Sequence, residues 1–440
     1  MRITYELGEW LADQLEAMPM DMLRNLAPGA ENWLARILGA QEADEVRALL
    51  TSPARRESGP STVFLPGMMG SLLASVRGIS GMLWFSGPVV MNGKINLLDL
   101  NEDGTEDRSP EVEIVPVGIE KTSYLKTILT LARETRLYEF PYDWRKRIES
   151  NAEQLHRALQ RWSREDPDRR FTLVAHSMGG MVARAYLALH PREAEQRVER
   201  LILLASPLYG VPIAVSIFTG DNPAVQIIDR LHPDNDVRRF ARSAPSCYQL
   251  LPAPRELWPG DLAYPLDWDA YDAAAWELPG LRQDYLDAAR AYHRLVLRAD
   301  PQVEIWQVAG CNYPTMVAMR QVAGPEDNDE GPRFIPTLEE SGENSGDDTV
   351  PLWSTRREGV RTLYVQESHA GVPAHGQVLE TVVRLAHGDD PTLPETLPEE
   401  RDILQQIGMA DLAQQVSHLR KRFEAGVFTR EDIFKMFFAR

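Results

Sequence analysis

The sequence predicts an α/β protein with a mainly parallel central β-sheet. From Thr62 onward, short apolar stretches alternate with amphipathic helical patterns, which is typical of βαβ units. One of these stretches runs directly into a serine-containing turn and then into a helical pattern. The residues expected to form buried strands are 63–65, 112–117, 171–175, 201–205, 303–309 and 362–365.

Three regions are expected along the chain. Residues 1–57 carry apolar side chains at helical spacing, among them Trp10 and Val46, and end in a polar stretch that is typical of a linker. Residues 62–388 contain the alternating pattern of the α/β domain. Beyond a proline-rich linker, residues 399–440 again show helical patterns.

The α/β region contains two stretches with their own character. Residues 207–300 are rich in Trp, Tyr, Pro and Asp and show little strand pattern, so we expect a cap over the functional site there. Residues 323–348 are acidic and rich in Gly and Pro, which predicts a surface excursion. Helices are expected at 152–164, packing on the sheet, and at 180–190.

Composition limits the classes of partner. Of the 440 residues, 43% are hydrophobic and 25% are charged, as in soluble globular proteins, and the net charge of -18 argues against a nucleic-acid partner. The same charge opposes docking on an anionic membrane. No secretory signal or stretch of about eighteen apolar residues is evident, so we expect a cytoplasmic protein. The two cysteines, Cys247 and Cys311, are expected to be free thiols.

The most informative segment is FTLVAHSMGGMV, residues 171–182. An apolar strand leads into a turn centred on Ser177 and out into an amphipathic helix, the arrangement called a nucleophile elbow in the α/β-hydrolase fold. Ala175 and Gly179 are small, as required where strand and helix cross closely. The sequence therefore predicts an α/β-hydrolase fold with Ser177 as its nucleophile.

A serine hydroxyl needs a base, and the base needs an orienting carboxylate. In this fold the chain order is Ser, then Asp or Glu, then His. Asp347 is the preferred acid and Asp348 the alternative, whereas His369 is the preferred base and His375 its rival on the same loop. The histidine at position 176 is predicted to point away from these groups and to have a packing role.

Backbone amides are expected to stabilise the oxyanion. One donor follows the nucleophile and is the N–H of Met178; the other is expected in the turn after the first strand, where Met68 is preferred over Met69. The histidines show no paired spacing for a metal, and no glycine fingerprint for a phosphate is present. No metal or cofactor is therefore expected.

These segments together resemble the lecithin:cholesterol acyltransferase family, which includes lysosomal phospholipase A2-like and phospholipid:diacylglycerol acyltransferase-like enzymes. The resemblance covers about residues 62–388. The matching motifs, in order, are FLPGMMGSL (64–72), PYDWR (141–145), AHSMGG (175–180), SPLYG (206–210) and GDDTVP (346–351).

The resemblance implies a serine-dependent lipid ester hydrolase or acyltransferase that works through an acyl-serine intermediate. It implies the roles already assigned to Ser177, Asp347 and His369, with Met68 and Met178 as oxyanion donors. Tyr142, Asp143 and Trp144 are interpreted as structural support. The chain departs from secreted relatives in lacking the cysteines of a disulfide-held lid, and it fits cytoplasmic bacterial-type members better.

Two further hypotheses remain open. One is an esterase for small or peptide-like acyl substrates that shares only the scaffold. The other is an effector whose terminal helices dock a protein partner and whose hydrolase activity is gated. The apolar C-terminal stretch 427–440 follows a basic cluster at 420–422, which allows a peripheral membrane contact; packing on the body of the protein is the alternative.

Overall fold

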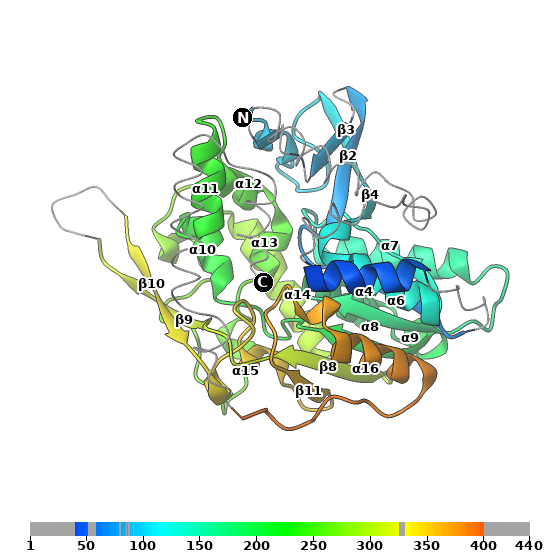
Figure 1. Cartoon of the computed structure of the whole chain (residues 1–440). Coiled ribbons are helices and arrows are strands. Elements are labelled where there is room, and N and C mark those ends of the chain that lie inside the picture. Colours follow the sequence, from blue (N-terminus) through cyan, green and yellow to red (C-terminus); the bar gives the residue numbers. More distant parts are fainter. Residues whose placement is uncertain are drawn as a thin grey trace.

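The computed structural model describes residues 40–51, 59–78, 81–84, 86, 89–90, 92–324 and 331–399. Its centre is a six-stranded sheet, in the order β11-β8-β7-β6-β1-β5, in which all paired strands are parallel (Figure 1). The strands are β1 (Ser61–Leu65), β5 (Arg136–Glu139), β6 (Phe171–His176), β7 (Val198–Leu204), β8 (Glu304–Gly310) and β11 (Arg361–Val365). The predicted α/β class with a mainly parallel sheet is confirmed.

Both faces of this sheet are covered by helices, so the central strands are apolar on both sides. In β1, Val63 and Leu65 belong to one hydrophobic cluster and Phe64 to the other. The first cluster includes residues of α7 (Ile148–Trp162), α8 (Met178–Leu189) and α14 (Gln283–Arg298). The second includes residues of α6 (Lys121–Glu134) and α16 (Gly376–His387).

The strand order changes direction between β1 and β6. The chain runs from β1 outward to β5, returns to β6 on the other side of β1, and then continues through β7, β8 and β11 toward the opposite edge. Parallel sheets bind their ligands beyond the carboxyl ends of the strands at such a switch point. Ser177 directly follows β6 and Gly67 follows β1, so the topology places both at this position.

The structure corrects two details of the expected sheet. The predicted buried strand at 112–117 is β4 (Val112–Ile119), which pairs antiparallel with β2 (Ser71–Gly78) in a separate three-stranded sheet with β3 (Gly81–Trp84). Only some of its residues are buried, because one side of this small sheet is open. β5 was not expected, since its half-exposed sequence RLYE lacks the apolar pattern of the central strands.

Residues 207–300 are mainly helical and contain no strand, as the sequence indicates. Before α14 this segment forms α10 (Ile213–Thr219), α11 (Pro223–Leu231), α12 (Val237–Ser243), α13 (Pro245–Gln249), η2 (Arg255–Leu257) and η3 (Ala273–Trp276). The excursion expected at 323–348 includes β10 (Arg333–Glu339), which pairs antiparallel with β9 (Thr315–Val322). β9 lies just before the expected stretch, and the hairpin of the two strands projects from the body (Figure 1). The remaining short elements are α9 (Pro191–Arg197), η1 (Ile95–Leu98), η4 (Gly342–Asn344), α15 (Leu352–Thr355) and η5 (Val372–Ala374).

Part of the N-terminal region is attached to the α/β body. The helix predicted around Val46 is α4 (Ala40–Thr51), and it packs on α6, where Lys126 forms an ion pair with Glu45. The other helical patterns of residues 1–39 and 402–438 lie outside the described residues. The division of the chain into three regions therefore stays a prediction.

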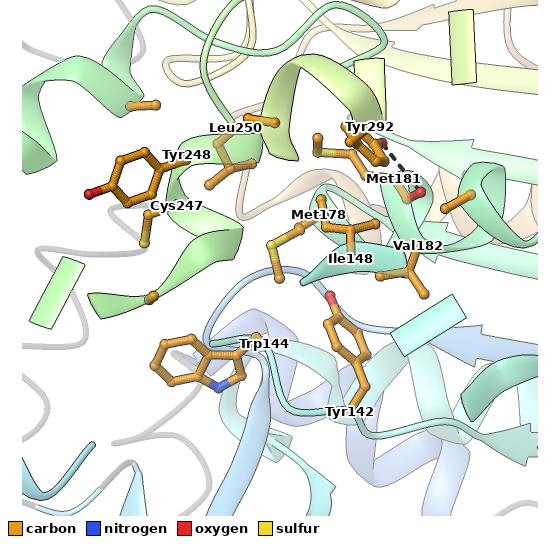
Figure 2. Packing of buried hydrophobic residues seen from close by; sticks show 14 of the residues in the cluster. Tyr142, Trp144, Ile148, Met178, Met181, Val182, Cys247, Tyr248, Leu250 and Tyr292 are labelled. Carbon is orange, nitrogen blue, oxygen red and sulfur yellow. Dashed lines mark hydrogen bonds between the residues drawn. The ribbon is translucent and has the colours of Figure 1, made fainter. Parts of the chain in front are cut away.

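The segment 142–145 is a buried connection between the sheet, the three-stranded sheet and the cap. The Tyr142 hydroxyl donates to the Pro66 carbonyl at 2.8 Å, and the Trp144 indole donates to the Ser71 carbonyl at 3.1 Å. Figure 2 shows both rings below α8, with Tyr248 of α13 near by in the same core. These contacts agree with the structural role expected for the segment.

The fully buried Arg145 guanidinium holds this connection together. It forms two hydrogen bonds to the Asp143 carboxylate, at 2.9 and 2.8 Å, an ion pair with Asp107 at 2.9 Å and a hydrogen bond to the Leu98 carbonyl at 3.0 Å. Removing these three charges from water costs free energy. The ion pairs offset this cost only while the guanidinium and both carboxylates are present.

Arg145→Met is expected to lower the free energy of unfolding by about 3–5 kcal/mol, because it leaves the carboxylates of Asp143 and Asp107 without their cation. Urea denaturation followed by tryptophan fluorescence measures this loss. Lys146→Met is the matched control: its ammonium lies 3.7 Å from Asp143 at the surface and is expected to contribute less than about 1 kcal/mol. Equal losses in the two variants would contradict the role of Arg145.

Candidate active site

Ser177 lies at a strained turn between β6 and α8. Its φ of 52° and ψ of -123° fall in a region that L-residues rarely adopt. The turn is tight because α8 crosses very close to the loop after β1: a Cβ at Gly179 would lie 2.5 Å from the Pro66 carbonyl oxygen, and one at Gly180 would lie 2.1 Å from Ser206 Oγ. Gly179 is therefore required by the approach of the backbone, and Gly180 by the neighbouring Ser206 and Leu203 side chains.

His369 stands between the serine and a carboxylate. Its Nε2 is 3.0 Å from Ser177 Oγ, and its Nδ1 is 3.0 Å from Asp347 Oδ2. Asp347 is fully buried, and its other oxygen accepts hydrogen bonds from the amides of Thr349 (3.1 Å) and Val350 (2.6 Å). The His369 amide donates to the Asp347 carbonyl at 2.6 Å, so backbone and side chain both fix the pair.

The two rival residues lie outside this chain of contacts. Asp348 has a φ of 81°, and its carboxylate accepts a hydrogen bond from the Thr349 hydroxyl at 2.6 Å. His375 precedes α16 and is half-buried, in the neighbourhood of Glu45 and Lys126. Of the candidates, the structure brings together Ser177, Asp347 and His369.

The electrostatic setting favours a protonatable His369. Burial disfavours the charged form of its ring, but the carboxylates of Asp347 and Asp348 outweigh this effect and raise the pKa of His369 above its usual range. Burial and the nearby charge of Asp347 raise the pKa of Asp348 to about 7. A proton taken from the serine would thus be held by a base that two acidic groups stabilise.

Two amides are available for an oxyanion. Met178 is the first residue of α8, so its N–H has no acceptor within the helix. In the loop after β1, the Gly67 amide donates to the Tyr124 hydroxyl at 3.0 Å, which leaves the following amide, that of Met68, as the candidate donor. Met68, Gly67 and Ser177 all line the same cavity.

That cavity has a volume of about 190 Å³ and is mainly apolar. Besides Ser177 and His369, it is bordered by Asp348 and by residues of the segment 207–250. Its apolar lining includes Met68, Met69, Val211, Ile213, Ile217 and Leu250. The segment 207–250 therefore contributes one wall of the space in front of the serine.

His176 has a contact that the sequence did not indicate. Its Nε2 is 3.0 Å from the His369 carbonyl oxygen, and its Nδ1 is 2.8 Å from the Tyr124 hydroxyl. The prediction that His176 points away from these groups is wrong, because the centres of its ring and the His369 ring are 4.9 Å apart, and the predicted packing role is incomplete. Tyr124 belongs to α6, more than fifty residues before the elbow, and no local motif marks it.

The described residues hold no group of three or more His, Cys, Asp or Glu side chains suited to a metal ion. Cys247 and Cys311 are both free and buried. In the same part of the chain, each helix is too short or too polar to cross a membrane.

The sequence around this site is similar to that of a known protein family. The family model described as lecithin:cholesterol acyltransferase matches residues 129–275, a region that runs from the end of α6 through the elbow and most of the cap. The similarity to this family is therefore carried by residues 129–275. Asp347 and His369 lie beyond the matched region.

Two curated relatives from Arabidopsis thaliana resemble the chain. Phospholipase A(1) LCAT3 is 29% identical over 133 residues, which are 28% of this chain and 29% of that protein. Lecithin-cholesterol acyltransferase-like 4 is 28% identical over 78 residues, 17% of this chain and 15% of that protein. The chain thus matches less than a third of the length of either relative.

Similar chains also occur among solved structures. A chain of the Tle4–Tli4 complex is 13% identical, with a TM-score of 0.48, and covers 76% of this chain and 98% of its own length. Mature lipase BlEst2 from Bacillus licheniformis is 14% identical, with a TM-score of 0.36, and covers 76% of this chain and 96% of its own length.

The raised pKa of His369 predicts the pH dependence of Ser177 reactivity. A general base must be neutral, so the rate of labelling by a fluorophosphonate is expected to fall as the pH drops through a pKa above the usual 6.5 of histidine. Asp348→Asn removes one of the charges that raise this pKa, and the acidic limb is expected to move to lower pH.

Asp347→Asn is the matched substitution at the neighbouring position. It removes the acceptor of the His369 Nδ1 proton, so labelling is expected to fall by about 10³- to 10⁴-fold. The paired rates separate the two aspartates: an intact rate in Asp347→Asn together with a loss of this size in Asp348→Asn would reverse their assignment.

Proposed function

We propose that this protein is a serine hydrolase or acyltransferase of lipid esters, with Ser177 as nucleophile, His369 as general base and Asp347 as the orienting acid. The observation that carries the proposal is the position of the His369 ring, 3.0 Å from both Ser177 Oγ and Asp347 Oδ2, at the mouth of an apolar cavity. This arrangement has the geometry that nucleophilic catalysis by a serine requires.

In the acylation step, His369 Nε2 accepts the hydroxyl proton as Ser177 Oγ attacks the ester carbonyl carbon. The tetrahedral intermediate carries its negative charge on the former carbonyl oxygen, where the amides of Met178 and Met68 are the proposed donors. The C–O bond to the leaving alcohol then breaks, and the proton on His369 passes to that oxygen. The product of this step is an acyl ester on Ser177.

Deacylation repeats the sequence with a second nucleophile. A water molecule or an acceptor alcohol loses its proton to His369 and attacks the acyl carbonyl, and Ser177 Oγ leaves and recovers the proton. Water yields a fatty acid, whereas an alcohol yields a new ester. Asp347 keeps the Nδ1–H of His369 oriented toward itself, so that Nε2 faces the serine in both steps.

The substrate class rests on the cavity and on the family. The lining by Met68, Val211, Ile217 and their neighbours favours an acyl chain over a polar group. Residues 129–275 match a family named for lipid acyl transfer, and one relative is named a phospholipase A1. The specific acyl donor and the acceptor are therefore proposed only as a lipid ester and as water or an alcohol.

Incubation with a mixed phospholipid and neutral-lipid extract tests the reaction. Mass spectrometry is expected to show free fatty acid or a transacylated lipid with the wild type and neither product with Ser177→Ala, because that variant lacks the attacking oxygen. His369→Gln is expected to behave like Ser177→Ala, and His375→Gln to retain activity within about twofold of the wild type.

The same experiment discriminates between the alternatives. Unchanged lipids together with fluorophosphonate labelling of Ser177 would favour the small-acyl esterase. Lack of both lipid turnover and labelling would reject the serine mechanism and favour the effector that a partner activates.

The apolar cavity predicts a dependence on chain length. For p-nitrophenyl esters from four to twelve carbons, kcat/KM is expected to rise about fourfold for each methylene that becomes buried, since each contributes about 0.8 kcal/mol. Ile217→Ser places a hydroxyl in the wall of the cavity and is expected to flatten this rise.

Val322→Ser is the control for this series, because it makes a comparable polar change on the exposed β9–β10 hairpin. Its profile should match that of the wild type. A wild-type profile that is flat or falls with chain length would exclude an acyl chain as the occupant of the cavity.

A further inference from the structure

Three parts of the site that are remote in sequence converge on Gly67. A methyl group at this glycine would lie 3.0 Å from His176 Nδ1, 3.1 Å from Ser177 Cβ and 3.3 Å from the Tyr124 hydroxyl. The loop after β1, the end of β6 and helix α6 therefore meet at one point behind the nucleophile. A methyl group there would push these neighbours apart by a few tenths of an ångström, so glycine allows the polar groups to gather closely.

These polar groups form one hydrogen-bond chain with a fixed direction. A carbonyl oxygen can only accept, so the contact of 3.0 Å between His176 Nε2 and the His369 carbonyl places the ring proton on Nε2. In the neutral ring Nδ1 must then accept, and the Tyr124 hydroxyl donates to it at 2.8 Å. The same hydroxyl accepts from the Gly67 amide at 3.0 Å.

Each member of the chain is kept in the required protonation state. Burial and the proximity of His369 lower the pKa of His176 well below its usual range, so the ring stays neutral. Burial raises the pKa of Tyr124, so its hydroxyl keeps the proton that it donates. The chain from Gly67 to His369 is thus fully satisfied at neutral pH.

The helix that carries Tyr124 is itself fixed to the loop of the base. Thr127 lies about one turn after Tyr124 on α6, and its hydroxyl donates to the Pro373 carbonyl at 2.7 Å. The Glu120 carboxylate caps the start of α6 by accepting from the Ser123 amide at 2.9 Å. Displacement of the loop 369–373 would therefore strain both the Thr127 contact and the chain through His176.

We infer that Tyr124 and His176 are positioning residues, which set the distance between the oxyanion loop at Gly67–Met68 and the base His369 on either side of Ser177. Neither touches the reacting atoms; both act through the backbone of groups that do. The inference rests on the proposed serine mechanism, and it adds two residues to the three of the triad.

The test uses the full-length chain and the rate of Ser177 labelling by a fluorophosphonate. Tyr124→Phe and His176→Phe each break the hydrogen-bond chain while retaining a ring, and each is expected to slow labelling by about 10- to 100-fold, the effect of misplacing a reacting group by a fraction of an ångström to 1 Å. With p-nitrophenyl butyrate the loss is expected in kcat, with KM changed by less than about twofold.

Three comparisons separate positioning from a general loss of stability. Because the two residues act as one unit, the double variant is expected to label no more slowly than the slower single variant. His176→Gln retains an N–H donor for the His369 carbonyl and is expected to recover part of the rate lost in His176→Phe. Tyr271→Phe removes another buried hydroxyl, which donates to the Pro252 carbonyl at 3.0 Å, and should label like the wild type.

The outcomes are distinct for the two proposals. Wild-type protein that is not labelled at all would overturn the serine mechanism. If the wild type is labelled and Tyr124→Phe stays within about twofold of it, or if the losses multiply in the double variant, the positioning chain is rejected while the mechanism stands. If Tyr124→Phe does not fold, the comparison of His176→Gln with His176→Phe tests the proposal instead. Equal labelling rates in these two variants would also reject the positioning chain.

Discussion

The close crossing of α8 over the ends of β1 and β6 is the constraint on which the rest of the site depends. At Gly179 the helix backbone approaches the Pro66 carbonyl so closely that not even one methyl group fits. This approach forces Ser177 into its strained turn, brings the first amide of α8 beside the oxyanion loop, and fixes the point that His369 must reach from β11. Loops supply His369 and Asp347, but the strand and the helix decide where these side chains meet Ser177.

The surroundings of the serine combine buried polar groups with apolar side chains. Asp347, His176 and Tyr124 are buried and have hydrogen-bond partners at short distances, and His176 and Tyr124 also line the cavity beside Ser177. In front of the serine, the cap segment contributes apolar side chains such as Val211 and Ile217. These apolar side chains lower the local dielectric constant, and this strengthens the electrostatic interaction between His369 and its neighbouring carboxylates.

Local sequence patterns were sufficient to predict the parts of the site that are built from residues close together in the chain. The elbow around Ser177 and the central strands such as β6 carry their own patterns, and the required chain order led to Asp347 and His369, which the structure brings to the serine. The sequence did not reveal Tyr124, because its role depends on a contact between α6 and two distant loops. β4 was assigned to the wrong sheet for a similar reason: its apolar residues resemble those of a buried parallel strand, and only its antiparallel pairing with β2 distinguishes the two.

The backbone of Ser177 also has a consequence for the protein's evolution in the laboratory. A non-glycine residue at this φ and ψ costs about 1–3 kcal/mol of strain, which is a substantial part of the net stability of a typical domain. Glycine would adopt the same backbone without that cost. A selection for thermal resistance alone would therefore reward replacement of Ser177, the proposed nucleophile. On the proposed mechanism, heat-stable descendants would be inert unless turnover were selected in the same round.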